Sequence, residues 1–213
     1  MTLGASRSNV ANLPALYPIL DIAYAQTAKQ VIAFAEELLA AGCTLLQYRN
    51  KSGDGRAMLE HARELKKLVG NSVRLIMNDR ADLCLAAGFD GVHVGQEDLS
   101  PDALRGIIGP DRWLGVSTHN PEQLREADLT SADYLAIGPV FATSSKEEPD
   151  PVVGLEGVRR ARGLTRKPLV AIGGITRANA ASVIEAGADS VAVISDLLRE
   201  PRKSAEEFFR ILG

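Results

Sequence analysis

One phrase recurs along the chain and restricts its fold more than any other feature. The segments AAGCTLLQ, AAGFDGVHV, SADYLAIG and EAGADSVAV each end a helix-like stretch, turn on small residues and enter a short apolar run. Glycine suits such turns because it readily takes the left-handed conformation that follows the last turn of a helix. The repetition predicts helices that alternate with parallel strands along the chain.

The repeated unit predicts eight strands. The β-rich apolar runs span residues 17–21, 43–47, 74–77, 91–94, 113–116, 134–137, 169–172 and 191–194. Between them, apolar residues recur at the three- and four-residue spacing of amphipathic helices, as in 28–40, 55–69, 121–127, 177–186 and 205–212.

The absence of a proline-, glycine- or serine-rich linker favours one closed domain. We expect a single (β/α)8 TIM barrel in the α/β class over residues 14–213, after a flexible N-terminal tail of residues 1–13. An open doubly wound sheet is the alternative. The segment YPILDIAYA, which contains the first strand, lacks the glycine-rich fingerprint that such a sheet would carry.

Composition restricts the partners and the compartment. The chain has 213 residues with a net charge of −3, which provides no basic field for nucleic acid or an anionic membrane. No apolar run reaches membrane-spanning length, and the first residues lack a signal-like apolar segment, so a cytoplasmic protein is predicted. Cys43 and Cys84 lie among apolar neighbours and are predicted to be buried thiols.

In a barrel of this type, chemistry is expected at the carboxyl ends of the strands. The second strand leads into QYRNK, residues 47–51. Alternation along an extended chain directs Gln47, Arg49 and Lys51 toward the barrel mouth, and Tyr48 and Asn50 away from it. The other interpretation is a solvated charged loop.

Two aspartates come after neighbouring strands at corresponding points. Asp79 comes after the third predicted strand and Asp98 after the fourth. Adjacent strands are about 4.8 Å apart, so both carboxylates can approach one hard cation such as Mg²⁺, which leaves its other positions to water and substrate phosphates. The alternatives are turn or helix-cap residues, and a paired acid and base.

The three histidines do not have the spacing of a zinc site. We expect His93 to be a satisfied histidine of the barrel core and His61 to lie on a polar helix face. His119 comes shortly after Ser117 at the end of the fifth strand, and we assign it no catalytic role.

Loops after the last three strands are suited to bind anions. The loop that begins at Gly138 is rich in hydroxyl groups and carries Lys146, so it could close over an anion. After the seventh and eighth strands, Gly173 and Gly174 are expected to let the backbone approach a phosphate, and Thr176 and Ser195 to cap the next helices. The rim would then hold two anion sites, one of them formed by backbone.

Seven segments at the predicted strand ends together resemble the thiamine-phosphate synthase family. They are QYRNK, NDRADL, GVHVGQEDL, LGVSTHN, DYLAIGPVFATSSK, AIGGIT and ADSVAVIS, and the resemblance runs from Tyr17 to the last helix. It implies a Mg²⁺-dependent transferase that joins 4-amino-2-methyl-5-hydroxymethylpyrimidine diphosphate to phosphorylated hydroxyethyl-methylthiazole, giving thiamine phosphate and pyrophosphate. It also implies that pyrophosphate can leave before the thiazole nitrogen attacks, without a protein nucleophile.

The resemblance also implies roles for individual residues. Asp79 and Asp98 would bind Mg²⁺, and Arg49, Lys51, Ser117 and Lys146 would be catalytic. The residues that would hold the two substrates are Gln47, Arg49, Lys51, Asn78, Ser117, Thr143, Ser145, Lys146, Gly173, Gly174, Ile194 and Ser195.

The chain departs from the usual family pattern at Asn50 and at Ser144–Ser145, and neither change removes a group that the reaction needs. Two alternatives have less need of this set: a thiazole tautomerase-like isomerase and a non-catalytic phosphate-binding barrel. Asp98 and Lys146 favour the synthase. The expected partners are the small phosphorylated substrates, with a homo-oligomer as a further option.

Overall fold

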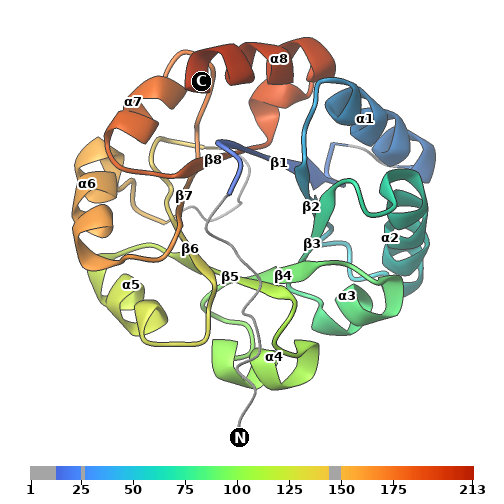
Figure 1. Cartoon of the computed structure of the whole chain (residues 1–213), viewed down its shortest axis with the longest axis horizontal. Coiled ribbons are helices and arrows are strands. Elements are labelled where there is room, and N and C mark those ends of the chain that lie inside the picture. Colours follow the sequence, from blue (N-terminus) through green and yellow to red (C-terminus); the bar gives the residue numbers. More distant parts are fainter. Residues whose placement is uncertain (1–12, 25–26, 144–149) are drawn as a thin grey trace, which may run out of the picture.

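The computed structural model describes residues 13–24, 27–143 and 150–213, and they form a closed barrel of parallel strands surrounded by a ring of helices (Figure 1). The strands are neighbours in chain order, and the last pairs with the first. The predicted TIM barrel is therefore confirmed, and the open sheet is excluded. The predicted tail lies outside the described residues except for Leu13, which packs against the barrel interior.

The strand and helix bounds agree closely with the predicted runs. The strands are β1 (Leu16–Asp21), β2 (Leu45–Arg49), β3 (Arg74–Asn78), β4 (Gly91–Val94), β5 (Trp113–Thr118), β6 (Tyr134–Ile137), β7 (Leu169–Ile172) and β8 (Ser190–Val193). The helices are α1 (Ala28–Ala40), α2 (Gly55–Val69), α3 (Ala81–Ala87), α4 (Pro101–Ile108), α5 (Pro121–Asp128), α6 (Gly154–Leu164), α7 (Ala180–Glu185) and α8 (Pro201–Leu212), with the 3₁₀ turn η2 (Ser195–Leu197) before α8.

Several elements differ from the prediction: α8 begins four residues earlier, at Pro201, β5 extends two residues further, to Thr118, and β2 and α7 also change. β2 lies two residues later than expected because Cys43 still belongs to the turn after α1, where its N–H donates to the Leu38 carbonyl at 3.1 Å. Helix α7 is shorter than predicted because Asn179 accepts the Thr176 N–H at 2.8 Å and holds the preceding residues in a turn.

The side chains of each strand alternate between two packed layers. One layer faces the helices, and the other fills the barrel with large side chains such as Tyr17, Trp113 and Tyr134. Gly115 provides the space for them, because a Cβ there would lie 2.1 Å from Cζ of Tyr134 and 2.4 Å from Nδ1 of His93. The interior is thus a packed core up to the rim, as in other barrels of this kind.

A recurring aspartate ties the βα units together at the amino-terminal end of the barrel. Three aspartates, each just before an even-numbered strand, accept the N–H of a leucine in the preceding strand at 2.7–2.9 Å: Asp90 with Leu75, Asp133 with Leu114, and Asp189 with Leu169. The same carboxylates pair with a basic residue: Lys66, Arg105 and Arg162, respectively. All three aspartates belong to the phrase that recurs in the sequence, which gives that phrase a structural role.

Both cysteines are buried free thiols, as predicted, and burial raises the pKa of each to about 12. Within the described ranges, each helix is too short or too polar to cross a membrane.

Candidate active site

The ends of β2 and β3 bring the predicted cations to two carboxylates. The Lys51 ammonium donates to Oδ2 of Asp79 at 2.5 Å, which joins the loops after these strands. Nearer the barrel, the Arg49 guanidinium pairs with Asp21, the last residue of β1. Asp21 is buried, and the sequence pattern did not distinguish it as a site residue although it too stands at a strand end.

Asp79 has an unusual backbone conformation. It is the non-glycine residue with a positive φ, 62°, among those described, and its N–H donates to the His93 carbonyl at 2.8 Å. Aspartate tolerates the left-handed region better than most residues, but the conformation still carries a conformational cost. Such local strain is typical of functional sites, where the surrounding structure must hold it.

Asp98 faces Asp79 from the loop after β4. Its Oδ2 accepts the Gly95 N–H at 2.7 Å, which fixes the carboxylate at the rim. Partial desolvation and the neighbouring negative charge of Asp79 raise the pKa of Asp98, whereas the Lys51 cation opposes the shift. The structure therefore brings the two predicted metal ligands together.

The donor set suits a cation that takes few protein ligands. The described residues contain no cluster of three or more His, Cys, Asp or Glu side chains able to hold a metal ion. Two carboxylates at one point, with an ammonium already drawn to one of them, fit Mg²⁺, which commonly binds one or two carboxylates and completes its shell with water and phosphate oxygens.

A hydrogen-bonded chain crosses the barrel below this rim. The Gln47 amide donates to the Tyr17 hydroxyl at 3.0 Å, and the two phenol oxygens of Tyr17 and Tyr134 are also 3.0 Å apart. His93 continues the chain, with Nδ1 3.0 Å from the Tyr134 oxygen and Nε2 2.8 Å from Oγ of Ser117. Both ends, Gln47 and Ser117, are predicted substrate residues, whereas the two tyrosines were not recognised.

His93 is neutral in this environment. Burial lowers its pKa to about 4, and the two ring nitrogens each have a hydroxyl partner. The prediction of a satisfied core histidine is confirmed.

Asn78 is the last residue of β3, and its side-chain amide donor has no partner within the described chain. Its side chain is buried. A buried donor left unpaired costs about 1–3 kcal/mol, so a ligand oxygen at this point would be favoured.

The other two histidines stabilise loops and helices. His61 is half-buried, and its Nδ1 is 2.9 Å from the Tyr48 hydroxyl, so the predicted polar-face position is wrong. The ring packs edge to face against Tyr48, with centroids 6.0 Å apart, and the Tyr48 hydroxyl also accepts from the Asn50 amide at 3.2 Å. His119 donates from Nδ1 to the Gly138 carbonyl at 2.6 Å, which anchors the start of the loop after β6.

The loop after β6 packs directly on the two glycines after β7. A Cβ on Gly173 would lie 2.5 Å from Cβ of Pro139, and one on Gly174 would lie 2.5 Å from the Ala142 carbonyl oxygen. Their φ angles are also positive, 98° and 63°. Close packing of the chain on itself therefore already requires glycine at both positions. Thr143 ends the described part of this loop, and Ser145 and Lys146 lie outside the described residues.

The expected helix caps after β7 and β8 are wrong. Asn179, and not Thr176, organises the first loop, since its amide donates to the Gly174 carbonyl at 3.1 Å while its oxygen accepts the Thr176 N–H. Ser195 opens the single turn η2 and makes no side-chain cap. Ile194 packs against the barrel interior. Any anion at this point would meet loop backbone and not the end of a long helix.

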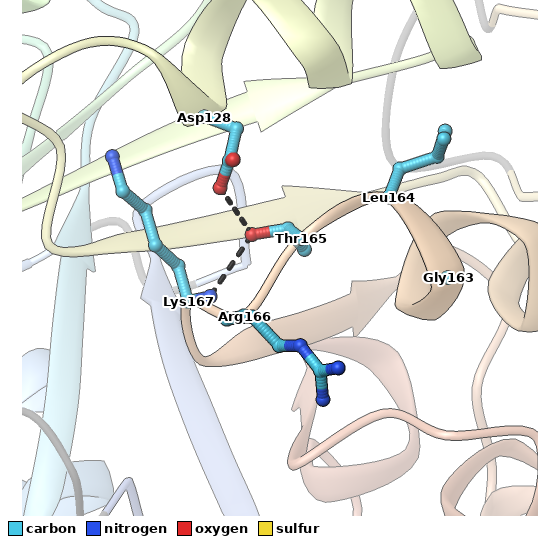
Figure 2. Close-up of a pocket in the computed structure, with 6 residues that line it drawn as sticks. All are labelled: Asp128, Gly163, Leu164, Thr165, Arg166 and Lys167. Carbon is cyan, nitrogen blue, oxygen red and sulfur yellow. Dashed lines mark hydrogen bonds between the residues drawn. The ribbon is translucent and has the colours of Figure 1, made fainter.

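A hollow of about 410 Å³ lies at the other end of the barrel (Figure 2). It is lined by Asp128, Gly163, Leu164, Thr165, Arg166 and Lys167, between the end of α5 and the link from α6 to β7. Thr165 donates to the Asp128 carboxylate there. This hollow contains none of the predicted site residues.

Comparison with known proteins shows to which family the chain belongs. A family model described as thiamine monophosphate synthase matches residues 16–197, from β1 through η2. The chain belongs to the thiamine monophosphate synthase family. This result confirms the resemblance of the seven segments, and it makes the chain an enzyme of thiamine biosynthesis, a transferase.

Members of the thiamine monophosphate synthase family are similar to the chain over most of its length. The thiamine-phosphate synthase of Koribacter versatilis is 60% identical over 203 residues, which cover 94% of this chain and 96% of that protein. The thiamine-phosphate synthase of Chloroflexus aurantiacus is 46% identical over 164 residues, 76% of each chain. A solved thiamine phosphate pyrophosphorylase from Pyrococcus furiosus superposes with a TM-score of 0.82 at 34% identity, covering 92% of this chain and 94% of that one.

Proposed function

We propose that the chain is a Mg²⁺-dependent thiamine-phosphate synthase that joins 4-amino-2-methyl-5-hydroxymethylpyrimidine diphosphate to phosphorylated hydroxyethyl-methylthiazole and releases pyrophosphate. The observation that supports this site most strongly is the meeting of Lys51, Asp79 and Asp98 at one rim. A diphosphate with its cation needs both signs of charge within a short distance, and this rim provides them.

The pyrimidine diphosphate is assigned to the side of the barrel formed by β2 to β5. Arg49 and Lys51 provide positive charge to the diphosphate, Ser117 a hydroxyl, and Asn78 an amide donor that the described chain itself leaves unused. Gln47 lies deeper, where it hydrogen bonds to Tyr17 at 3.0 Å. We assign Lys146, by the family resemblance alone, to the same diphosphate.

Asp79 and Asp98 are the groups proposed to hold Mg²⁺. When bound, the cation would withdraw negative charge from the departing diphosphate. The protein's own contribution is to keep the two carboxylates at one point, through the left-handed backbone of Asp79 and the 2.7 Å hydrogen bond from Gly95 to Asp98.

The thiazole phosphate is assigned to the loops after β6, β7 and β8. The backbone N–H groups of Gly174 and Ser195 donate to no acceptor in the described part of the chain, so they remain available to a phosphate. Gly173 and Ile194 flank them, and Thr143 and Ser145 would add hydroxyls. Loops after the last two strands are a frequent phosphate site in barrels of this type.

The chemistry asked of the protein is charge stabilisation and alignment. Pyrophosphate can dissociate from the pyrimidine methylene because the ring stabilises the cation that remains, after which the thiazole nitrogen attacks. Fixed donors aimed at the departing oxygens lower that barrier, and two adjacent anion sites hold the reactants in line.

Product formation by the purified full chain tests this proposal. The chain is incubated with both phosphorylated substrates and Mg²⁺, and thiamine phosphate and pyrophosphate are quantified by chromatography and a coupled assay. We expect the two products in equal amounts, and none when either substrate is left out. The absence of product would refute the synthase, and undiminished product with excess chelator would refute the metal role alone.

A further inference from the structure

The loops after β7 and β8 are joined by one arginine and one aspartate to which the proposed function assigns no role. Arg177 lies in the loop after β7, beyond Gly173 and Gly174, and Asp196 lies in the turn η2 that follows β8. The Arg177 backbone N–H donates to Oδ2 of Asp196 at 2.8 Å, and the guanidinium contacts the same carboxylate through Nε at 3.0 Å and Nη2 at 3.3 Å. Both carboxylate oxygens are therefore engaged by one residue.

A second acid holds the arginine from the other side. Nη1 of Arg177 pairs with Glu207 on α8, and all three side chains are about one-third exposed or less. The guanidinium is thus fixed between the β8 loop and the last helix. A planar group with several donors is well suited to such fixed geometry, which a single flexible ion pair would not provide.

The same two strands are joined by a similar contact at their other end. There Asp189 accepts the Leu169 N–H at 2.7 Å and an Arg162 N–H at 2.8 Å. Each contact combines one aspartate, one backbone N–H and one arginine. The amino-terminal contact recurs in the earlier units at Asp90 and Asp133, as expected for a structural device, whereas the Asp196 contact lies at the rim where substrates bind.

We propose that Arg177 and Asp196 are positioning residues that set the spacing between the two backbone donors, Gly174 and Ser195, for the thiazole phosphate. This inference rests on the proposed function. Asp196 is the residue next to Ser195, and Arg177 lies three residues after Gly174, so a change in their contact moves one donor relative to the other. A phosphate held by both donors loses affinity when their separation varies, because binding must then also order the loops.

The experiment compares Asp196→Asn and Arg177→Ala with the matched control Asp189→Asn in the full chain. Steady-state kinetics give KM for each substrate and kcat, calorimetry gives the affinity for the thiazole phosphate alone, and thermal melting reports stability. We expect the two rim variants to raise KM and Kd for the thiazole phosphate at least fivefold, with KM for the pyrimidine diphosphate changed less than twofold. Arg177→Lys should recover part of the loss. Asp189→Asn should leave both KM values within twofold.

The outcomes separate this inference from the proposed function. Wild-type chain that forms thiamine phosphate, together with rim variants whose KM values equal those of the wild type, would overturn the positioning role and leave the synthase intact. A parallel rise in both KM values, or an equal effect of Asp189→Asn, would show a general structural role and would also overturn it. Wild-type chain that neither forms product nor binds the thiazole phosphate would overturn both.

Discussion

The hydroxyls of Tyr17 and Tyr134 form a 3.0 Å hydrogen bond inside the barrel, between residues that are 117 positions apart in the chain. Their rings meet edge to face, with centroids 6.2 Å apart. Burial raises the pKa of both phenols, so each remains protonated and must find an acceptor as well as a donor. Gln47 and His93 complete this requirement and extend the contact to the rim.

Removal of the central hydroxyl should destabilise the barrel. In Tyr134→Phe, the Tyr17 hydroxyl and Nδ1 of His93 both lose a buried partner, and each unpaired group costs about 1–3 kcal/mol. We expect the free energy of unfolding in urea to fall by about 2 kcal/mol or more. Tyr24→Phe, at a side chain that is 45% exposed, is the control and should change it by less than about 0.5 kcal/mol. Equal effects at both positions would contradict the importance of the buried chain.

A methyl group at Gly115 should be poorly tolerated for a steric reason. Its Cβ would lie 2.1 Å from Cζ of Tyr134, a buried ring that cannot move without disturbing the interior. Overpacking of this kind costs about 1–3 kcal/mol, and we expect Gly115→Ala to reach the upper end. Gly106→Ala is the matched control in α4, where a Cβ meets nothing within 4 Å and alanine favours the helix by about 0.5–1 kcal/mol. In chemical denaturation, the free energy of unfolding should fall for Gly115→Ala and rise for Gly106→Ala.

The buried imidazole of His93 should make stability depend on pH in a defined window. Its pKa is about 4 in the folded chain and 6.5 when unfolded, so between these values the unfolded chain binds a proton that the folded chain does not. Stability due to this group is therefore complete above pH 6.5 and is lost as the pH falls toward 4, by about 3 kcal/mol in total.

Comparison with His93→Gln measures how much His93 protonation contributes to the pH dependence of stability. The wild-type free energy of unfolding should fall more steeply than that of the variant, by up to about 1.4 kcal/mol for each pH unit between about pH 6 and about pH 4.5. Denaturation at several pH values measures the difference. Parallel curves for the two proteins would show that His93 titrates normally in the folded chain.

The barrel could be predicted because its information is local and repeated. Each unit carries its own helix period, its small-residue turn and its strand, so the eight strands could be located without knowing what they contact. The aspartates of the repeated phrase were visible too, but their partners were not. Asp90, Asp133 and Asp189 accept N–H groups 15, 19 and 20 positions away, in the preceding strand, and the pairing of neighbouring strands brings those groups together.

Some features of the candidate site could likewise be predicted from the sequence, and others could not. Asp79 and Asp98 could be paired from the sequence because they come after neighbouring strands at matching points. The two interior tyrosines could not, because their contact depends on the closure of the barrel and on the space left by Gly115. The bond between Arg177 and Asp196 was missed for a related reason: two loops that are separate in sequence meet only where β7 and β8 end side by side.

Asp98→Asn should remove a charge from the rim and lower activity without lowering stability. The amide oxygen can still accept the Gly95 N–H, and loss of the negative charge removes the repulsion with Asp79 that contributes to the raised pKa of Asp98. Stability at about pH 7 should therefore be no lower than that of the wild type. Activity should fall about a hundredfold or more, since one lost electrostatic contact to a developing charge costs on the order of 3 kcal/mol in the barrier.

Glu97→Gln is the control: it removes an exposed carboxylate one residue away and should retain near wild-type kcat. Calorimetric titration of Mg²⁺ in the presence of pyrophosphate should show weakened binding only for Asp98→Asn. If both variants lose the same activity, the overall charge of the loop matters and a specific ligand at position 98 does not.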